Sequence, residues 1–495
     1  TKLCKKLGIP VPRRYLTDQL TRSNICLDKI NIVPLVIKGK GDASRPRYIF
    51  DTDSKLFQRL ILENIEAKDM FIQEFIYGTG HGYYVLAKNG EIVAEFMHRR
   101  LIELKPSGGP SIVAESFFDP ELLTLGRRLI KYLKWSGVAM VEFRRDFETG
   151  KYYFIEFNPK FWGSLELSVK CNVSFPELLV RTFTENIPAV KLKYKRNCRF
   201  YWVINGLHYL FEAPKLYFKM LLGSIKDARV CHTDFHIDDP TELFSSIFIN
   251  TASSLYRATK KHTIVQKRCN PQIYRHLVQW IEKTSLFIFD LDGTLTKLPV
   301  NWSKLRKEMI NRGLINPWDT IIIGITKAYS KNKAVFEQIN NFLKKNELKS
   351  IKNLKKNRCV KKLMHSLKQR GKKIAVISKQ SEEVIKEVLA KLDIPDYIDA
   401  KCGRENTPIR VKQIMYILSL FSKTHNMNNL SRKRNDCVVI GDKMHDVVAA
   451  IKAGCRGILL SDSLTQTYQA IEFKIPFFKN INSFYNFLKN LGNRV

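Results

Sequence analysis

The chain has 495 residues, of which 44% are hydrophobic and 26% charged, which is typical of folded proteins and long enough that we expect at least two domains. Gly at 24 and Pro at 18 are too few for a fibrous chain, and no apolar stretch reaches the roughly 20 residues that span a bilayer. Lys and Arg number 83 against 47 Asp and Glu, a formal net charge of +36.

The positive charge has three readings: a nucleic-acid surface, a site for small polyanions such as ATP and phosphate esters, or Lys-rich solvated faces. The basic runs LKKNELKSIKNLKKNRCVKK and LSRKRN lack the interleaved aromatic residues of a base-stacking platform. They favour solvated faces, then small anions, and disfavour nucleic acid.

The ten cysteines form no CxxC pair and have no His cluster beside them, which argues against a zinc site. Scattered cysteines in a chain that shows no secretory leader indicate buried thiols and a reducing compartment. We therefore expect a cytoplasmic protein.

The first part of the chain reads as a mixture of strands and helices. An amphipathic helix is expected at 121–135. From about Lys191 to His262 the pattern is mostly helical, and 260–272 reads as a linker. Strands rich in β-branched and aromatic residues are predicted at 33–39, 70–76, 82–88, 91–98, 137–146 and 151–158.

From Ser285 onward, apolar strands alternate with helices. The strands are LFIFD, KKIAVIS and CVVIG, with a helical block at about 301–369 and further helices at 382–392 and after the third strand. This alternation predicts a doubly wound parallel α/β sheet.

Carboxylates follow two of these apolar strands. Asp290 and Asp292 come just after LFIF, and Asp442 and Asp446 follow CVVIG. Parallel sheets place their sites at the carboxyl ends of strands. Converging carboxylates repel one another unless a cation such as Mg²⁺ lies between them, which predicts a metal site.

Two further residues could bind a phosphate at this edge. Ser378 ends KKIAVIS and offers a hydroxyl, and Lys412 offers a cation. Arg410 is a rival for the cationic role.

The N-terminal part has three weaker signals. Lys38 ends a strand beside a Gly-rich loop and could bind phosphates. The stretch QEFI could bind adenine through its backbone. Glu142, Glu156 and Asn158 lie on two facing strands, where residues two apart share a face, and could hold Mg²⁺ between the phosphates of ATP. The alternative is that these side chains are polar only because they face solvent on one side of a hairpin.

DLDGT followed by GDKMHD resembles the haloacid dehalogenase superfamily of phosphohydrolases, from about Ser285 to the C-terminus. The resemblance implies Asp290 as nucleophile, Asp292 as general acid and base, and Ser378 and Lys412 as phosphate-binding residues. Magnesium or manganese would be held by Asp290, the backbone carbonyl of Asp292, and Asp442, with Asp446 close by.

In one place the sequence departs from this superfamily: Gln413 stands where Pro usually follows the cation. The helical block has the place of a cap domain, which selects small phosphorylated metabolites in that superfamily. By pattern the chain is similar to phosphoglycolate phosphatases, an analogy only.

The order GIPVPR, FIQEFIYGTGHGYYVL, HRRLIELKPSGGPS, VEF, IEFNPKFWGS resembles ATP-grasp ligases of the carbamoyl-phosphate-synthase type, over about residues 1–190. The resemblance implies an acceptor site lined by His98-Arg99-Arg100 and Ser107-Gly108-Gly109, with Lys160 where Arg is frequent. It also implies Lys38, Ser44 and Arg45 at the ATP phosphates, Glu74 and Ile76 at the adenine and ribose, and Mg²⁺ on Glu142, Glu156 and Asn158.

The prediction is an α/β protein with an α+β ATP-grasp domain at 1–190, a helical extension and linker at 191–275, and a hydrolase domain at 280–495 with a cap at about 299–370. Few residues precede GIPVP, so we expect the upstream lobe of the ATP-grasp domain to be missing.

The expected function is bifunctional. One half would convert a carboxylate to an acyl phosphate with ATP and pass it to an amine-type acceptor, and the other would hydrolyse a small phosphate monoester with Mg²⁺. The alternatives are a phosphatase with a non-catalytic, nucleotide-sensing ATP-grasp half, and a basic nucleic-acid-binding protein.

Overall fold

In the computed structural model, the structure describes residues 2–16, 34–39, 46–50, 70–103, 111–185, 193–207, 214–227, 230–234, 245, 248–249, 251, 271–424 and 436–492. The chain forms two compact units. The first unit contains Thr1–Pro12, Ile76–Asp146 and Lys151–Arg268, and the second contains Arg13–Phe75, Phe147–Gly150 and Cys269–Val495. Because both units are discontinuous along the chain, the boundaries predicted from the sequence remain predictions.

A seven-stranded sheet organises the first unit, in the order β11-β10-β7-β6-β5-β8-β9. Its strands run antiparallel except for the parallel pair β10 and β11. The strands are β5 (Gly78–Lys88), β6 (Glu91–Glu103), β7 (Ser111–Ser116), β8 (Gly137–Asp146), β9 (Tyr152–Asn158), β10 (Arg199–Tyr201) and β11 (Val230–Thr233). The helices are α1 (Lys2–Lys6), α3 (Pro120–Leu133), α4 (Leu165–Lys170), α5 (Phe175–Thr184) and α7 (Pro214–Lys226).

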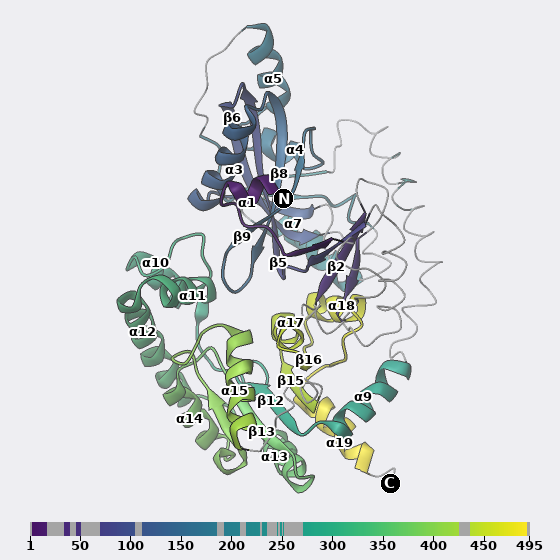
Figure 1. The fold of residues 1–495 in the computed structure, drawn as a ribbon, viewed down its shortest axis with the longest axis vertical. Coiled ribbons are helices and arrows are strands. Elements are labelled where there is room, and N and C mark those ends of the chain that lie inside the picture. The colour runs from purple at the N-terminus through teal and green to yellow at the C-terminus, as the bar shows by residue number, and fades with distance from the viewer. Residues whose placement is uncertain are drawn as a thin grey trace. The chain divides into compact units, whose positions relative to one another are not determined.

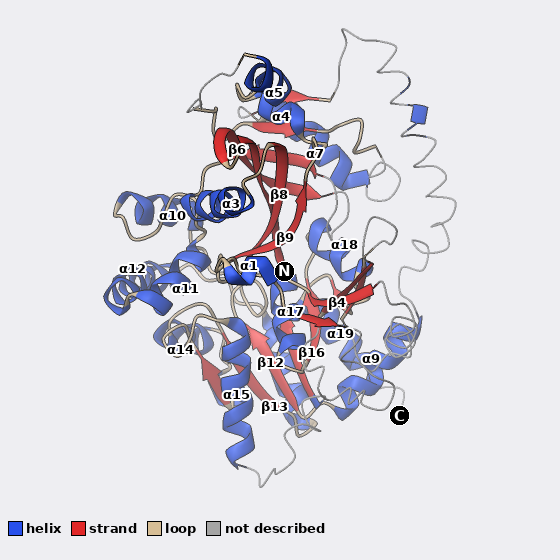
Figure 2. Cartoon of the chain, turned by 45° about the horizontal axis from the view of Figure 1, so that its top comes forward, coloured by secondary structure: helices blue, strands red, loops and turns tan. Residues whose placement is uncertain are grey.

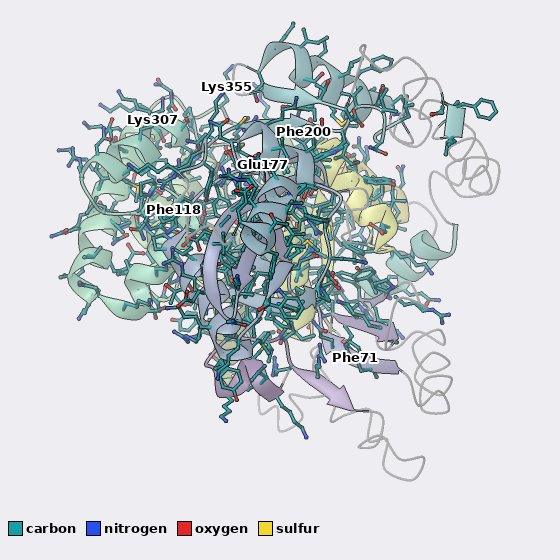
Figure 3. All side chains as sticks on the ribbon, turned by 90° about the horizontal axis from the view of Figure 1, so that it is seen from above. Phe71, Phe118, Glu177, Phe200, Lys307 and Lys355 are labelled. Carbon is teal, nitrogen blue, oxygen red and sulfur yellow. The ribbon has the colours of Figure 1, made fainter. Side chains whose placement is uncertain are left out.

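Helices cover both faces of this sheet. Tyr83 and Val85 pack with the apolar side of α3, whereas Tyr84 and Leu86 pack with α4 and α5, because successive strand residues point to opposite faces. Phe200 of β10, labelled in Figure 3, is fully buried in the second of these clusters.

The segment predicted to be mostly helical from about Lys191 contains two strands as well as a helix. β10 and β11 extend the sheet, and the described helix α7 lies between them in sequence. The aromatic and β-branched run RFYWVI carries a strand signal that outweighs the helical pattern around it. The linker predicted at 260–272 lies outside the described residues except for its last two.

A small antiparallel sheet in the second unit has the order β1-β4-β2-β3. Its strands are β1 (Arg14–Leu16), β2 (Leu35–Gly39), β3 (Arg47–Ile49) and β4 (Met70–Glu74). Three of the sequence-predicted features, Lys38, Glu74 and the QEFI stretch, therefore lie on or beside strands.

A six-stranded, fully parallel sheet forms the core of the C-terminal part, in the order β14-β13-β12-β15-β16-β17. Figure 1 labels β12, β13, β15 and β16 of this sheet. Its strands are β12 (Leu286–Asp290), β13 (Lys373–Ile377), β14 (Ala400–Cys402), β15 (Cys437–Gly441), β16 (Arg456–Leu460) and β17 (Phe477–Phe478). The central strands β12 and β15 are buried at every position, as expected for parallel strands with both faces covered.

Helices lie on both sides of this sheet (Figure 2). Phe287 and Phe289 pack with α9, α13, α14 and α19, and Leu286 and Ile288 pack with α15 and α17. The helices are α9 (Pro271–Lys283), α13 (Arg358–Gln369), α14 (Glu382–Lys391), α15 (Arg410–Thr424), α17 (Met444–Lys452), α18 (Leu464–Glu472) and α19 (Ile481–Gly492), with a 3₁₀ turn η3 (Pro395–Tyr397). The predicted doubly wound sheet is confirmed.

Three helices after β12 form a separate apolar cluster, which we call the cap. They are α10 (Trp302–Asn311), α11 (Ile321–Lys331) and α12 (Lys333–Ile351). Helix α13, which lies within the range predicted for the cap, buries Val360, Leu363 and Leu367 against the sheet rather than against the other cap helices.

In the Lys-rich run from 343 to 362, the lysine side chains toward the C-terminal end face solvent. One of them is Lys355, which Figure 3 labels together with the exposed Lys307 of α10. Among the described helices, none has the length and apolar character needed to cross a membrane.

Of the described cysteines, Cys4, Cys171, Cys402, Cys437 and Cys455 are buried thiols and Cys359 is a half-buried one. Cys198 forms a disulfide, contrary to the expectation of thiols throughout.

Candidate functional site: a buried carboxylate cluster and a polar sheet face

The carboxyl ends of β12, β13 and β15 meet at one edge of the parallel sheet. Asp290 is paired in register with Ile377, the residue before Ser378, and Phe289 is paired with Ile440. Asp442 follows β15 directly, and Asp446 lies in the first turn of α17. The register therefore brings together side chains that are more than 150 residues apart in sequence.

Three carboxylates form a compact cluster at this edge. Oxygen atoms of Asp290, Asp442 and Asp446 all lie within 4.8 Å of one another. Asp290 and Asp446 are buried, with 4% and 1% of their surfaces exposed. Three of the four carboxylates that DLDGT and GDKMHD predict to converge are in this cluster, and Asp292 is not among them.

Two glycines make room for these carboxylates. Gly293 has a φ of +100°, and a Cβ there would lie 2.4 Å from Oδ2 of Asp442. A Cβ on Gly441 would lie 2.4 Å from the Cβ of Asp446. Any larger residue at either position would push a carboxylate out of the cluster.

Arg410, rather than Lys412, provides the cation of the cluster. Its Nη2 lies 2.6 Å from Oδ1 of Asp290, and its Nε lies 2.9 Å from Oδ1 of Asp446. Lys412 is exposed, since two residues along a helix correspond to a rotation of about 200°. Gln413 accepts a hydrogen bond from Arg410 (3.0 Å) and donates one to the backbone oxygen of Ser378 (2.6 Å).

Asp292 and Ser378 lie beside the carboxylate cluster but are not part of it. Asp292 accepts a hydrogen bond from the backbone N–H of Leu298 at 2.7 Å, which orients its side chain within the loop after β12. The buried Ser378 hydroxyl donates to Gln380. Thr294, which the sequence reading did not single out, donates to Oδ2 of Asp290 at 3.2 Å.

The electrostatics of the cluster are unbalanced. Burial raises the pKa of Asp290 to about 8; Arg410 opposes this shift, and the charges of Asp446 and Asp442 add to it. Burial and the charge of Asp446 likewise raise the pKa of Asp442 to about 6. The guanidinium of Arg410 and the more exposed ammonium of Lys443, which lies 3.8 Å from Oδ2 of Asp442, are thus too little positive charge for the three carboxylates.

The donor set fits a hard divalent cation such as Mg²⁺ or Mn²⁺. Within the described residues, Oδ1 of Asp446 is buried and has no hydrogen-bond partner, because its approach to Arg410 is not aligned as a hydrogen bond. A bound metal ion would stabilise a buried carboxylate oxygen that lacks a hydrogen bond and lies beside two further carboxylates.

A second group of polar residues lies on one face of the seven-stranded sheet. Glu142 on β8 is paired in register with Glu156 on β9, and Nδ2 of Asn158 donates to Oε1 of Glu156 at 2.6 Å. The structure therefore brings the three predicted ligands to one end of the β8–β9 pair. Glu156 is exposed, and Glu142 is half-buried.

Arg100 already pairs with one of these carboxylates. Its Nη1 lies 2.9 Å from Oε1 of Glu142 and 3.6 Å from Oε1 of Glu103. Arg99 pairs instead with Glu115 at 2.9 Å. Arg99 and Arg100 therefore point to opposite faces of β6, as successive strand residues do, and do not line one acceptor site together.

His98 was predicted to line an acceptor site, and the structure buries it. It has 1% of its surface exposed, and its Nε2 contacts the Ser164 hydroxyl at 2.6 Å and the Tyr84 hydroxyl. Burial lowers the pKa of His98 to about 3. Lys160 is exposed, and Ser107, Gly108 and Gly109 lie outside the described residues.

The predicted nucleotide-binding residues are only partly described. Lys38 is half-buried on β2 opposite Phe71, and Glu74 ends β4 with its carboxylate 3.2 Å from Nε of Arg13. In the first unit, the backbone oxygen of Ile76 accepts a hydrogen bond from Arg144 at 2.9 Å. Ser44 and Arg45 lie outside the described residues.

Comparison with known proteins supports a family for the C-terminal part. The model of the haloacid dehalogenase-like hydrolase family matches residues 287–460. This match contains the buried carboxylate cluster and confirms the resemblance read from DLDGT and GDKMHD.

Over a stretch of 80 residues, the chain is 36% identical to acetyl-CoA carboxylase 1 of Oryza sativa subsp. japonica. This stretch is 16% of the present chain and spans 3% of the length of that relative.

Two solved structures are similar to different parts of the fold. Carboxyaminoimidazole ribonucleotide synthase from Aspergillus clavatus, solved with ATP, is 16% identical with a TM-score of 0.35, covering 46% of this chain and 60% of that one. A predicted phosphoglycolate phosphatase from Haemophilus somnus 129PT is 16% identical with a TM-score of 0.31, covering 42% of this chain and 98% of that one. At this identity and similarity they bear on neither substrate nor mechanism.

Proposed function

We propose that the C-terminal part, from about Ser285, is a metal-dependent phosphomonoester hydrolase. The observation that carries the proposal is the approach of Asp290, Asp442 and Asp446 to within 4.8 Å beside Arg410. Asp290, Asp442 and Asp446 would hold Mg²⁺, which when bound neutralises negative charge between the carboxylates and a phosphate dianion.

In the proposed reaction Asp290 is the nucleophile. One of its carboxylate oxygens attacks phosphorus, and the ester P–O bond breaks as Asp292 protonates the leaving alkoxide. Asp292, now a carboxylate, takes a proton from a water molecule that attacks the aspartyl-phosphate and releases inorganic phosphate and free Asp290. Arg410 would stabilise the charge on the transferred group, and Ser378 would bind one of its oxygens.

The test is phosphate release from a panel of small phosphorylated metabolites with Mg²⁺, with Mn²⁺ and with excess EDTA. We expect hydrolysis of at least one ester that stops in EDTA and returns when Mg²⁺ is added. Hydrolysis that continues at full rate in EDTA would overturn the metal assignment.

We further propose that the N-terminal part is an ATP-grasp-type ligase. It is supported by the resemblance of its sequence and by the alignment of Glu142, Glu156 and Asn158 at one end of β8 and β9. A substrate carboxylate would attack the terminal phosphorus of ATP and displace ADP. An amine would then attack the acyl carbon and displace phosphate.

ATP consumption distinguishes this proposal from the alternatives. Steady ADP formation that requires a carboxylate and an amine supports a ligase, whereas ATP binding without turnover supports a nucleotide-sensing domain. A nucleic-acid-binding protein would instead show an affinity for DNA or RNA that falls steeply with salt concentration.

A further inference from the structure

Arg404, in the loop after β14, is an unusual side chain in this protein because it is charged, long and completely enclosed. Only 1% of its side chain is exposed, and it is among the largest fully buried side chains of the described residues. Charged residues are almost never buried to this extent without close partners.

All five N–H donors of the guanidinium have acceptors. Nη1 donates to Oε1 of Glu347 at 2.7 Å and to the backbone oxygen of Lys379 at 3.1 Å. Nη2 donates to Oε2 of Glu347 at 2.9 Å and to the backbone oxygen of Asn340 at 3.2 Å. Nε donates to Oδ1 of Asn340 at 2.5 Å. Arg404 and Glu347 thus form a bidentate pair with no unused donor on the arginine.

These acceptors belong to two parts of the hydrolase. Glu347 and Asn340 lie on α12 of the cap, two turns apart on one side of that helix, whereas Lys379 follows Ser378 at the end of β13. The backbone N–H of Arg404 also donates to the oxygen of Gln380 at 2.9 Å. One guanidinium therefore joins the cap to the loop that carries the proposed phosphate-binding hydroxyl.

Weaker polar contacts run along the same side of α12, which lies beside α14 in Figures 1 and 2. Nδ2 of Asn340 lies 3.3 Å from Oε1 of Glu405, and Lys344 pairs with Glu383 of α14 at 3.1 Å. The Lys344–Glu383 pair is partly exposed, unlike Arg404 and Glu347. Exposed pairs contribute little, so the buried pair dominates this contact.

Separating α12 from the core would break the bidentate pair with Glu347 and the two hydrogen bonds to Asn340. Removing one member of a buried ion pair is strongly unfavourable, because the remaining charge stays desolvated. Lys379, whose backbone oxygen accepts a hydrogen bond from Arg404, follows Ser378 directly in the chain. The contact thus adjoins the proposed phosphate-binding hydroxyl.

We propose that Arg404 and Glu347 latch α12 to the hydrolase core, keep the cap closed beside the carboxylate cluster, and so limit the size of the phosphate ester that can enter. Arg404 acts here as a positioning residue. The size limit rests on the proposed phosphatase function, whereas the latch itself does not.

The test compares two phosphate esters of different size in the parent and in two variants, with Mg²⁺ present. Glu347→Gln keeps the volume and removes the charge, and Arg404→Lys keeps the charge and removes the fork of donors. The probes are methyl phosphate, which is small, and para-nitrophenyl phosphate, which is bulky. We expect the ratio of kcat/KM for the bulky to the small probe to rise about tenfold in both variants, since an unsatisfied buried donor or charge weakens the closed state by about that factor. Lys344→Ala, which removes the exposed pair on the same side of α12, should leave the ratio within twofold.

Hydrogen exchange of the full chain measures the latch without relying on activity. Backbone amides of α12 should exchange about tenfold faster in Glu347→Gln and Arg404→Lys than in the parent, while those of β12 and β15 stay unchanged. Unchanged exchange in α12 would overturn the latch. Faster exchange with an unchanged probe ratio would overturn the size limit. If the parent hydrolyses neither probe nor any other ester, the proposed function fails, and hydrogen exchange alone decides whether the latch exists.

Discussion

The two groups of acidic residues in this protein differ in how their charge is handled. In the C-terminal cluster, Asp290 and Asp446 are buried and share a single guanidinium, that of Arg410. On the N-terminal sheet, Glu156 is exposed, and Glu142 has an arginine of its own, Arg100, at 2.9 Å. Burial turns the first group into a site that fits a cation even before substrate binds, because water cannot screen the carboxylates from one another.

The second group needs no cation by itself. Water reaches Glu156, and Arg100 balances Glu142. A metal ion would become favourable there only when nucleotide phosphates add further negative charge. The comparison teaches that carboxylates on neighbouring strands form a ready metal site where they are buried and a conditional one where water reaches them.

The largest expected effect tests the buried cluster. In Asp290→Asn the amide is a poor nucleophile and a metal ligand is lost, so phosphate release should fall by on the order of 10³-fold or more. Calorimetric titration of the same preparation with Mg·ATP should give the parent affinity, because Glu142, Glu156 and Asn158 belong to the other unit.

The matched control is Asp396→Asn, which makes the same change at an exposed position of the C-terminal part and should keep parent phosphate release. Loss of both phosphate release and ATP binding in Asp290→Asn would show that ATP binding depends on the carboxylate cluster. Full retention of phosphate release would exclude Asp290 as the nucleophile.

The next effect concerns the exposed group. Glu156→Gln removes a charge with almost no change in volume, so ATP consumption by the proposed ligase should fall by roughly 10²-fold, as for other electrostatic contributors to a transition state. ADP formation is the measurement, and thermal unfolding should be unchanged because the side chain is exposed. Parent-level turnover would mean that β9 carries no metal ligand.

A smaller effect distinguishes Arg410 from Lys412. Arg410→Lys keeps the charge but cannot reach Asp290 and Asp446 together with the same fork, so phosphate release should fall about tenfold. Lys412→Ala should leave it within twofold, because this side chain faces solvent. The reverse order of the two effects would restore the assignment made from the sequence.

The smallest effect is a pH dependence confined to the first unit. The pKa of buried His98 is about 3 in the folded protein, against an ordinary value near 6.5 when unfolded. Since the unfolded state binds the proton more readily, stability should be constant above pH 7 and fall as the pH drops below about 6.5, by roughly 1 kcal/mol per unit of pH.

Urea unfolding of the parent and of His98→Gln at pH 7 and 5.5, followed by tryptophan fluorescence, measures this contribution. The loss on acidification should be smaller in His98→Gln than in the parent. His365→Gln, a change at an exposed histidine of the C-terminal part, serves as the control and should behave as the parent. An equal loss in all three proteins would show that His98 is protonated without cost.

Much of the fold could be predicted because its signals are local. The uniformly apolar strands LFIFD, KIAVI and CVVIG predict a sheet buried on both faces, and the structure has them as β12, β13 and β15. The strands of the N-terminal sheet follow from aromatic and β-branched runs in the same way. The segment after Lys191 was harder, because the strand β10 has only three residues and gains its stability from β7 and β11 beside it.

The sequence by itself determined the carboxylates of the C-terminal cluster. Each follows an apolar strand within a few residues, and parallel strands necessarily end at one edge of their sheet. Glycine at positions 293 and 441 is equally readable as a requirement of sharp turns, although only the structure identifies Asp442 and Asp446 as the groups that need the space.

Only the tertiary structure decided which cation joins the cluster and what holds the cap. Arg410 and Lys412 are separated by one residue, and the choice between them depends on the rotation of α15 relative to the sheet, which no local pattern specifies. Arg404 and Glu347 are 57 residues apart and look like ordinary surface charges in a Lys-rich sequence. They meet because the folded cap and core enclose both, and in that enclosure each charge is stable only with the other present.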